Sequence, residues 1–270
     1  MRHGREIFRP AHSRLPVPDL SADPDAPLDV LAIAAHPDDV ELSAGGTMCL
    51  LRAQGYRTGI LDLTRGEMGT RGTPETRAAE AAAAAEILGL AFRRNLGLPD
   101  GEIRNTKHAQ RLVVQAVRAT RPSIVLINAP EDRHPDHGDA ARLAGDALFA
   151  SGLAMLATTG MDGAPQRPHR PSHVLHYMNT LEFEPTFVVD VSSVWEQRIR
   201  AMRAFATQFD AADDGPATFI SSPAFMQFVE ARARSFGYRI GAEFGEPLLY
   251  RHGPVGIGDL VTTLGRTQAL

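Results

Sequence analysis

Short apolar runs alternate with longer segments of helical periodicity through the first half of the chain. Runs of roughly four to eight apolar residues are typical of strands that are buried on both faces of a parallel sheet. The longer segments repeat their apolar residues with the spacing of a helix that packs one face against a sheet. The pattern predicts strands at 29–35, 56–63, 92–95 and 124–127, and helices at 41–54, 74–88, 106–120 and 138–150.

The second half of the chain has a less regular pattern. A proline-rich loop at 165–171 separates it from the first half. The tail at 238–260 is interrupted by glycines, and we expect it to fold back over the functional site. Between the loop and the tail, the pattern predicts strands at 173–179 and 187–191 and helices at 193–206 and 222–236.

The order of strand, helix, strand and helix predicts an α/β fold. Such an order gives a parallel sheet with right-handed crossovers, so we predict a Rossmann-like three-layer sandwich with a mostly parallel sheet. Residues 28–270 are expected to form one domain, in which a smaller C-terminal portion at 161–270 joins a core at 28–160 and completes one cavity. Residues 1–27 show neither period and are predicted to be a flexible arm.

Composition narrows the function classes. The formal net charge is -4, so no basic character argues for nucleic acid or an anionic membrane surface, and a small molecule is the expected substrate. No apolar run reaches ~18 residues, which argues against a transmembrane span. No signal-peptide pattern follows the N-terminal charges, and the single cysteine, Cys49, excludes an intramolecular disulfide framework. We therefore predict a cytoplasmic protein.

The first predicted strand runs directly into the cluster His36-Pro-Asp-Asp39. Ligands bind at the carboxyl ends of the strands in open α/β sheets, which is where this cluster lies. His36 and Asp39 are three residues apart, so a helical turn brings both to one ion while Asp38 points about 100° away. Asp38 is then free to act as a different carboxylate, although the spacing alone does not exclude the reverse assignment of the two aspartates.

A second cluster, Glu131-Asp-Arg-His-Pro-Asp-His137, follows the predicted strand at 124–127. A catalytic zinc ion takes three protein ligands and keeps one position open, so the first cluster needs a third ligand from elsewhere. The carboxyl ends of the two strands can meet at one sheet edge. His36 and Asp39 could instead simply cap the following helix, but two such clusters, each after a strand, favour a metal site.

These motifs carry a resemblance to a known superfamily. With Ala35-His-Pro-Asp-Asp-Val-Glu41 and His134-Pro-Asp-His137, the chain resembles the zinc-dependent de-N-acetylases that include the phosphatidylinositol-glycan and mycothiol deacetylases. Further segments are similar to the bacillithiol-biosynthesis deacetylases, which remove acetate from N-acetylglucosaminyl malate. These segments are Gly55-Tyr56, Asp62-Leu-Thr64, Gly72-Thr73, Asn95-Leu-Gly-Leu-Pro-Asp100, Gly138 after the second cluster, and Ile240-Gly-Ala-Glu-Phe.

The resemblance implies a metal-dependent hydrolysis of an acetamide. It implies that Zn²⁺, with Fe²⁺ as the alternative, is held by His36, Asp39 and His137, and that Asp38 takes the proton of the attacking water. A protonated His134 then stabilises the oxyanion, and its sequence neighbour Asp136 is suited to orient His134 and keep it charged. The resemblance also implies a homo-oligomer, in particular a hexamer.

Four residues are the expected substrate contacts: Arg77, Asp100, Glu41 and Arg133. Arg77 matches a family arginine implicated in substrate binding, and the alternative is an ordinary surface arginine. Asp100 is expected to bind a sugar hydroxyl, and the alternative is that it only shapes its turn. The loop Arg65-Gly-Glu-Met68 departs from the more acidic loop of some bacillithiol enzymes. An inositol-linked or oligosaccharide substrate is therefore the alternative to the malate conjugate.

Two rival functions come from other classes. A nucleotide-binding Rossmann module is disfavoured because the first turn lacks a glycine fingerprint and is acidic where a pyrophosphate would lie. A metal- or sugar-binding relative without catalysis is disfavoured because Asp38 and His134 are both present and neither is needed merely to hold zinc.

Overall fold

The computed structural model describes residues 26–209 and 216–258. The expected flexible arm at 1–27 falls, apart from its last two residues, outside this range. Within it, seven strands form one sheet in the order β3-β2-β1-β4-β5-β7-β6. Their bounds are β1 Val30–Ala34, β2 Thr58–Thr64, β3 Phe92–Leu98, β4 Ile124–Ile127, β5 His173–Tyr177, β6 Phe187–Asp190 and β7 Gly245–Tyr250.

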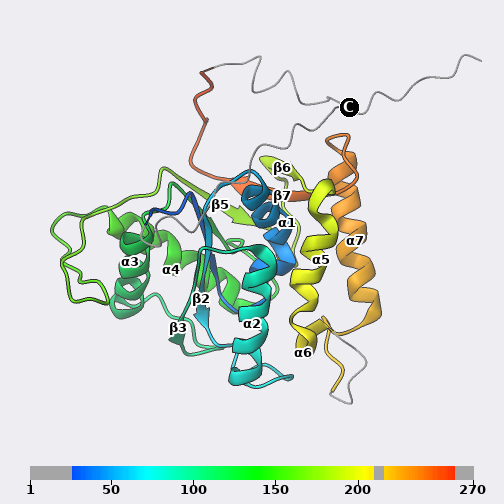
Figure 1. Cartoon of the computed structure of the whole chain (residues 1–270), viewed down its shortest axis with the longest axis horizontal. Helices are drawn as coiled ribbons and strands as arrows, with labels where there is room; N and C mark the ends of the chain where they lie inside the picture. Colours follow the sequence, from blue (N-terminus) through cyan, green and yellow to red (C-terminus); the bar gives the residue numbers. More distant parts are fainter. Residues whose placement is uncertain (1–25, 210–215, 259–270) are drawn as a thin grey trace, which may run out of the picture.

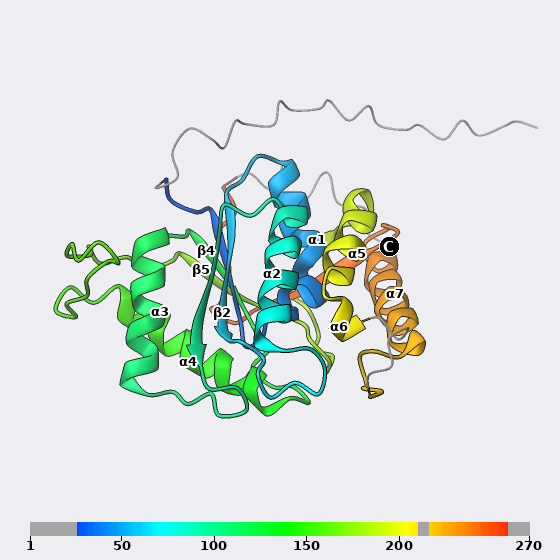
Figure 2. The ribbon, with the colours of Figure 1, turned by 60° about the horizontal axis from the view of Figure 1, so that its bottom comes forward.

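Helices cover both faces of this sheet (Figure 1). The α-helices are α1 Asp39–Ala53, α2 Pro74–Leu88, α3 Lys107–Thr120, α4 Pro135–Ser151, α5 Trp195–Arg203, α6 Ala206–Phe209 and α7 Pro223–Tyr238. In the rotated view, α3 and α4 lie on one side of the sheet, and α1, α2, α5 and α7 lie on the other (Figure 2). The predicted three-layer α/β architecture is therefore confirmed.

Alternate residues of the buried strands pack into two separate hydrophobic cores, one on each face of the sheet. Along β1, Leu31 and Ile33 pack with apolar residues of α3 and α4. Val30, Ala32 and Ala34 point the other way and pack with residues of α1, α2, α5 and α7. Both faces of β1 are buried, which explains why its sequence is a continuous apolar run rather than an alternation of apolar and polar residues.

The sheet has its topological switch point at β1. β1 pairs in parallel with β2 on one side and with β4 on the other. The chain crosses from β1 to β2 through α1, and it reaches β4 only after β3 and α3. A crevice opens at the carboxyl ends of two such strands, because their connections leave in opposite directions. The two chemical clusters follow these two strands.

The C-terminal portion joins the same sheet. β7 pairs antiparallel with both β5 and β6. The expectation that the whole tail folds back over the site is therefore wrong for residues 245–250, which form an inner strand. β5 and β6 are not direct neighbours, because β7 lies between them.

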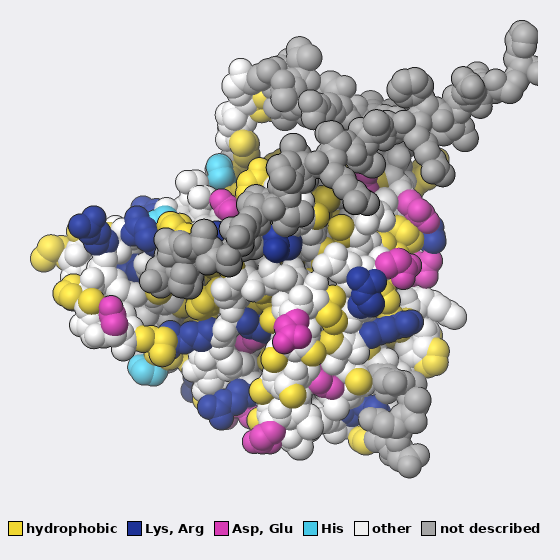
Figure 3. Space-filling view, in the orientation of Figure 1, with side chains coloured by type: hydrophobic (Ala, Val, Ile, Leu, Met, Phe, Trp, Pro, Cys, Tyr) yellow, Lys and Arg dark blue, Asp and Glu magenta, His cyan; other side chains and the backbone are white. Residues whose placement is uncertain are grey.

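The surface charge and the length of the helices bear on possible membrane contact. On the face drawn in Figure 3, acidic and basic side chains are interspersed. None of the helices in the described ranges is long and apolar enough to span a bilayer.

Helix α1 is broken just after the first cluster, and a buried ion pair holds the break. Ala44 leaves the helical conformation, with φ -139° and ψ 15°. Glu246 of β7 accepts hydrogen bonds at 2.8 Å from the Gly46 N–H and at 2.6 Å from the Thr47 N–H, as an N-terminal cap would. Arg198 of α5 lies 3.1 Å from Glu246 and donates to the carbonyl of Leu42 across the break.

We expect Glu246→Ala to lower the free energy of unfolding by about 3–5 kcal/mol, because Arg198 would remain buried without its counter-charge. Denaturant unfolding measures this. Glu243→Ala is the matched control: Glu243 pairs with Arg234 on the surface and should change stability by no more than about 1 kcal/mol. Equal losses from the two variants would show that the buried pair does not stabilise the break.

Candidate metal centre and active site

The turn after β1 places the first cluster in a strained conformation. Asp38 has φ 112° and ψ -24°, a conformation that few residues other than glycine adopt. Asp39 begins α1, and its Oδ2 accepts a hydrogen bond at 3.0 Å from the backbone N–H of His36. The tight turn brings the His36 ring and the Asp39 carboxylate to the same side. Backbone strain of this kind is concentrated at functional sites.

Asn128 fixes the first cluster to the end of β4. Its Oδ1 accepts from the Ala35 N–H at 3.0 Å, and its Nδ2 donates to Asp39 Oδ2 at 3.1 Å. The same amide donates to Asn179 Oδ1 at 3.3 Å. One buried amide therefore ties the ends of β1 and β4 to the carboxylate that is predicted to bind metal.

The second cluster brings His137 to the same point. His137 lies in the first turn of α4, and its Nε2 is 3.1 Å from Asp39 Oδ1. Its other ring nitrogen, Nδ1, is hydrogen-bonded to Asp132, whose second oxygen accepts from the Thr180 N–H at 3.0 Å. A neutral histidine held in this way keeps its Nε2 lone pair for a ligand.

The donor atoms suit a divalent cation. His36 Nδ1 lies 3.7 Å from Asp39 Oδ2, and His137 Nε2 lies 3.1 Å from Asp39 Oδ1. Donors on one tetrahedral zinc ion, each bound at about 2.0–2.2 Å, lie roughly 3.3–3.6 Å apart, so these separations need little adjustment. One ring nitrogen from each of His36, His134 and His137 also lies within 4.8 Å of the others. This close group contains His134 in place of the predicted ligand Asp39. Histidine nitrogens beside a carboxylate are donors that suit a metal of this class.

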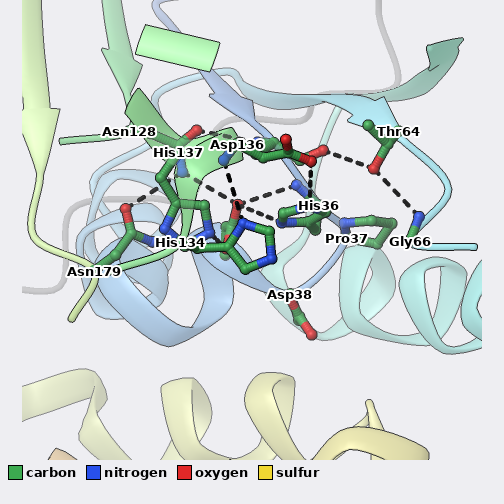
Figure 4. Close-up of polar contacts among 12 residues, drawn as sticks. His36, Pro37, Asp38, Thr64, Gly66, Asn128, His134, Asp136, His137 and Asn179 are labelled. Carbon is green, nitrogen blue, oxygen red and sulfur yellow. Dashed lines mark hydrogen bonds and ion pairs between the residues drawn. The ribbon is translucent and has the colours of Figure 1, made fainter. Parts of the chain in front are cut away.

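Asp38 lies apart from this donor set. In Figure 4 the three histidine rings gather on one side, and the Asp38 carboxylate points away from them. Arg77 Nη2 donates to Asp38 Oδ2 at 3.0 Å and also to the carbonyl of Pro37. Burial raises the pKa of Asp38 to about 7, although the charge of Arg77 opposes this shift. Asp38 is thus a buried carboxylate whose pKa suits a proton acceptor and donor at neutral pH.

The guanidinium of Arg77 is hydrogen-bonded to groups of the protein itself. Besides Asp38 and Pro37, it donates to the carbonyl of Gly66 at 3.4 Å. Its side chain lines the hollow but is only 5% exposed. The expected substrate contact of Arg77 is corrected accordingly: the Nη2 end of its guanidinium holds Asp38.

His134 and Asp136 do not form the predicted side-chain pair. His134 Nδ1 accepts at 3.3 Å from the backbone N–H of Asp136, and the Asp136 carboxylate faces His36 Nε2 at 3.3 Å instead. Burial and the nearby His36 and His137 lower the pKa of His134. This corrects the expectation that Asp136 keeps His134 charged. The ring of His134 presents Nε2 as its free donor, because Nδ1 is an acceptor.

Glu41 does not reach the hollow. It is fully buried in α1 and forms an ion pair with Arg93 of β3. Arg93 also binds Asp62 of β2, at 2.9 Å from Nε. The expected substrate contact of Glu41 is corrected accordingly: its place beneath the first cluster joins α1 to the sheet.

The site opens into a hollow of about 220 Å³, which the cluster and the C-terminal portion line together. Asp100 lies here, but its Oδ1 is 2.9 Å from His36 Nε2, so it contacts a predicted ligand as well as the hollow. Burial raises the pKa of Asp100, but the hydrogen bond and charge of His36, the Met68 N–H and the charge of Arg77 together outweigh burial and bring the pKa to about 2. Arg133 lines the rim, with its guanidinium 4.7 Å from the Phe219 ring centre.

A larger hollow of about 720 Å³ lies elsewhere, between α4 and β5. It contains none of the predicted ligands and no Asp or Glu side chain, so the smaller hollow is the candidate site.

Sequence reasoning missed two residues. Asn128 directly follows the predicted strand at 124–127, a position where a polar side chain is well placed to reach the sheet edge. Asp132 lies within the second cluster, and a carboxylate near a metal-binding histidine is a common orienting partner. Both carried a positional signal, but nothing in the sequence identified which atom each would contact.

Comparison with known proteins places this geometry in context. A sequence model of the family described as PIG-L, GlcNAc-PI de-N-acetylase, matches residues 31–148. A diacetylchitobiose deacetylase from Thermococcus kodakarensis is 33% identical over 190 residues, which cover 67% of this chain and 70% of that protein. A probable N-acetyl-alpha-D-glucosaminyl L-malate deacetylase 2 from Bacillus cereus is 28% identical over 198 residues, covering 67% and 84%.

The chain is also similar to a hydratase and to a protein of solved structure. A 4-oxalmesaconate hydratase from Pseudomonas putida is 28% identical over 196 residues, covering 66% of this chain and 73% of that protein. Among solved structures, a conserved protein from Thermus thermophilus superposes with a TM-score of 0.75 and 37% identity. That match covers 86% of this chain and 98% of the Thermus chain.

Proposed function

The chain belongs to the GlcNAc-PI de-N-acetylase (PIG-L) family, and on this premise we propose that it hydrolyses the N-acetyl group of an N-acetylglucosamine conjugate with the help of a divalent metal ion, zinc in the first place and iron(II) as the alternative. One observation carries the proposal. Two metal donors, Asp39 and His137, lie 3.1 Å apart in one hollow with a separate buried carboxylate, Asp38. Ligands and a general base kept apart in this way suit amide hydrolysis.

The metal would be held by His36, Asp39 and His137. When bound, such an ion polarises the amide carbonyl and makes a water molecule more acidic. Asp38 accepts one proton of the attacking water while the oxygen of that water bonds to the acetyl carbon. Arg77 keeps Asp38 in place through the hydrogen bond of 3.0 Å.

His134 acts on the developing oxyanion. Its Nδ1 accepts from the backbone N–H of Asp136, so the neutral ring carries its proton on Nε2 and can donate it in a hydrogen bond. As the C–N bond breaks, the amine nitrogen takes the proton that Asp38 received. The acid product gives the remaining proton of the water to the amine or to solvent, so acetate and a glucosamine conjugate leave and Asp38 returns to its ionised form.

We propose N-acetylglucosaminyl malate, the substrate of bacillithiol biosynthesis, as the conjugate. The named Bacillus cereus relative supports this choice. Arg133 provides a guanidinium at the rim of the hollow, where it can bind a carboxylate of the malate unit in a charge-assisted hydrogen bond. The Thermococcus kodakarensis relative supports the alternative, a small N-acetylglucosamine oligosaccharide, and an inositol conjugate is the other.

A substrate panel tests this proposal. Acetate release from the malate conjugate is expected to exceed release from free N-acetylglucosamine by roughly ten- to hundredfold in kcat/KM, the value of a charged contact of about 1.5–3 kcal/mol. Diacetylchitobiose and an inositol conjugate complete the panel, and mass spectrometry identifies the products. Equal rates on all four would overturn the malate assignment but leave the deacetylase activity standing.

Hydration is the second candidate reaction, favoured by the similarity to the Pseudomonas putida hydratase. A metal site with a general base can activate water for addition to a double bond as well as for attack on an amide. Incubation with 4-oxalmesaconate and loss of its ultraviolet absorption would detect hydration. Acetate release without hydration is the expected result.

We expect Arg77→Ala to lower kcat by about ten- to hundredfold with little change in KM, because a hydrogen bond between charged groups contributes about 1.5–3 kcal/mol and Asp38 would lose its anchor. Steady-state kinetics on the malate conjugate and on free N-acetylglucosamine measure this. Arg104→Ala, which alters an exposed arginine, is the control. A large rise in KM confined to the malate conjugate would instead restore Arg77 as a substrate ligand.

The assembly and location of the protein are also proposals. The family resemblance supports a homo-oligomer, with a hexamer as the specific case. The single cysteine, Cys49, supports the proposal of a cytoplasmic location. Light scattering decides the first: a strictly monomeric active species at micromolar concentration would contradict it.

A further inference from the structure

The two nitrogens of the His36 ring face different kinds of group. Nε2 lies 2.9 Å from Asp100 Oδ1 and 3.3 Å from Asp136 Oδ2. Nδ1 lies on the other side, 3.7 Å from Asp39 Oδ2. His36, Asp100 and Asp136 all have side chains that are at least nine-tenths buried. Water therefore competes little for either nitrogen.

Hydrogen-bond chemistry assigns a role to each nitrogen. An ionised carboxylate only accepts, so the nitrogen that faces Asp100 and Asp136 must carry the proton. A ring that binds a metal is a neutral imidazole with one N–H, so Nδ1, beside Asp39, is the nitrogen left to bind the metal. We infer that Asp100 and Asp136 are positioning residues that fix His36 with its proton on Nε2 and present Nδ1 to the metal. This inference rests on the proposed metal site, and it gives Asp100 a role other than the expected contact with a sugar hydroxyl.

The same arrangement occurs, with the nitrogens exchanged, at His137. There Nδ1 is bonded to the carboxylate of Asp132, and Nε2 lies 3.1 Å from Asp39 Oδ1. The two oxygens of Asp39 thus each face the free nitrogen of one histidine. Carboxylates that hold metal-binding histidines by the opposite nitrogen fix the ring orientation and raise the basicity of the ligand.

The orienting carboxylates are themselves held by loop backbone. Asp100 Oδ2 accepts from the Met68 N–H at 2.8 Å, and Asp136 Oδ2 accepts from the Gly101 N–H at 2.8 Å. Glu67 completes the connection by accepting from the Asp100 N–H at 3.0 Å. The loop that contains Glu67 and Met68 and the turn that contains Asp100 and Gly101 are therefore joined to His36. These bonds explain why Asp100 is fixed at the end of β3 rather than free in the hollow.

The competing arrangement uses the same three side chains as ligands. His36, Asp100 and Asp136 have donor atoms within 4.8 Å of one another, so an ion could bind them through Nε2. An ion there would be held from the side of His36 that faces away from Asp39. The two arrangements predict opposite tautomers of His36, and this difference can be measured.

Nitrogen-15 NMR of the histidine rings distinguishes them. The full chain is loaded with one equivalent of Zn²⁺, and His36→Gln identifies the His36 signals. The expected result is a proton on Nε2 and a metal-shifted Nδ1. A proton on Nδ1 with the metal on Nε2 would overturn the inference.

Metal affinity gives the second readout, measured by competition with a chromophoric chelator. Loss of an orienting partner typically weakens metal binding about 10- to 100-fold, which is the effect expected for Asp100→Ala. Asp100→Asn should lose less, because the amide oxygen still accepts from Nε2–H. Glu102→Gln, two residues further on and exposed, is the matched control and should leave the affinity unchanged.

Two outcomes would contradict the role of Asp100. A loss as large as that of His36→Gln would make Asp100 a ligand, and an unchanged affinity in Asp100→Ala would make it irrelevant to His36. Thermal unfolding of each variant shows that it is folded. Neither readout uses acetate release, so the inference can hold even if the proposed substrate is wrong, and it can fail while the protein remains a deacetylase.

Discussion

Replacing Asp38 by asparagine is expected to lower kcat by roughly 10²–10⁴-fold, the range that a positioned general base contributes, while the protein keeps its full metal content. The Asp38 carboxylate is held by Arg77 at 3.0 Å, whereas Asp39 is the aspartate that faces His36 and His137. Asparagine has nearly the same shape as aspartate, but it cannot accept the proton of water. Acetate release together with metal analysis of the purified variant measures both quantities.

Asp39→Asn should lose metal as well as turnover, because Asp39 faces the free nitrogens of two histidines. Comparison of these adjacent variants separates the two roles that the sequence left open. Asp139→Asn, on the exposed side of α4, is the control and should change neither. Full metal content in both Asp38→Asn and Asp39→Asn would refute the assignment of Asp39 as a ligand. Loss of metal in Asp38→Asn alone would reverse the two roles.

The sequence predicted where the site would form because its signals are local. Apolar runs such as Ile124–Ile127 mark strands, and the polar clusters follow two of them directly. In a parallel sheet, strands that are adjacent bring their carboxyl ends together, so the meeting of His36 with His137 follows from topology. The parallel strands and the helices that follow them were predicted for the same reason. Their apolar periodicity is determined within each segment.

The contacts of individual side chains could not be predicted in this way. Asp136 precedes His137 and lies close to His134 in sequence, yet its carboxylate turns to His36, 100 residues earlier. Glu41 belongs to the first motif, but the position of Arg93 on β3 decides that it is buried in an ion pair. Spacing along the chain fixes the direction of a side chain on its own helix. It does not tell which group another element brings into reach.

The break in α1 shows the same limit. Gly45 and Gly46 lower helix propensity, but the break is stabilised by Glu246, which is 200 residues from Gly46 in sequence, and by its partner Arg198. That glutamate lies on β7, whose place between β5 and β6 was not predicted. Antiparallel pairing of a short C-terminal strand depends on which sheet edge remains open after the parallel strands have formed. Such long-range competition leaves little trace in the local pattern.

Withdrawal of the metal is expected to abolish acetate release, and Zn²⁺ is expected to restore it. Without a metal, Asp38 can still accept a proton, but the developing oxyanion loses the cation and keeps only hydrogen-bond donors such as His134 Nε2–H. The reaction then loses most of the electrostatic stabilisation of its transition state. Dialysis against a chelator, followed by titration with Zn²⁺ or, without oxygen, Fe²⁺, measures the loss and its recovery. Full activity in a preparation shown to be metal-free would refute the proposed mechanism.

The same titration should also change stability, because the metal binds the folded site and not the unfolded chain. At a free Zn²⁺ concentration 100 times the dissociation constant, the folded state should gain about 2.7 kcal/mol. Asp39→Asn provides the control, since it removes a donor that lies 3.1 Å from His137 Nε2 without altering the hydrophobic cores. This variant should gain much less stability from the same metal concentration. An equal gain in the variant would mean that Zn²⁺ binds outside the site of His36, Asp39 and His137, and recovery of activity would then need another explanation.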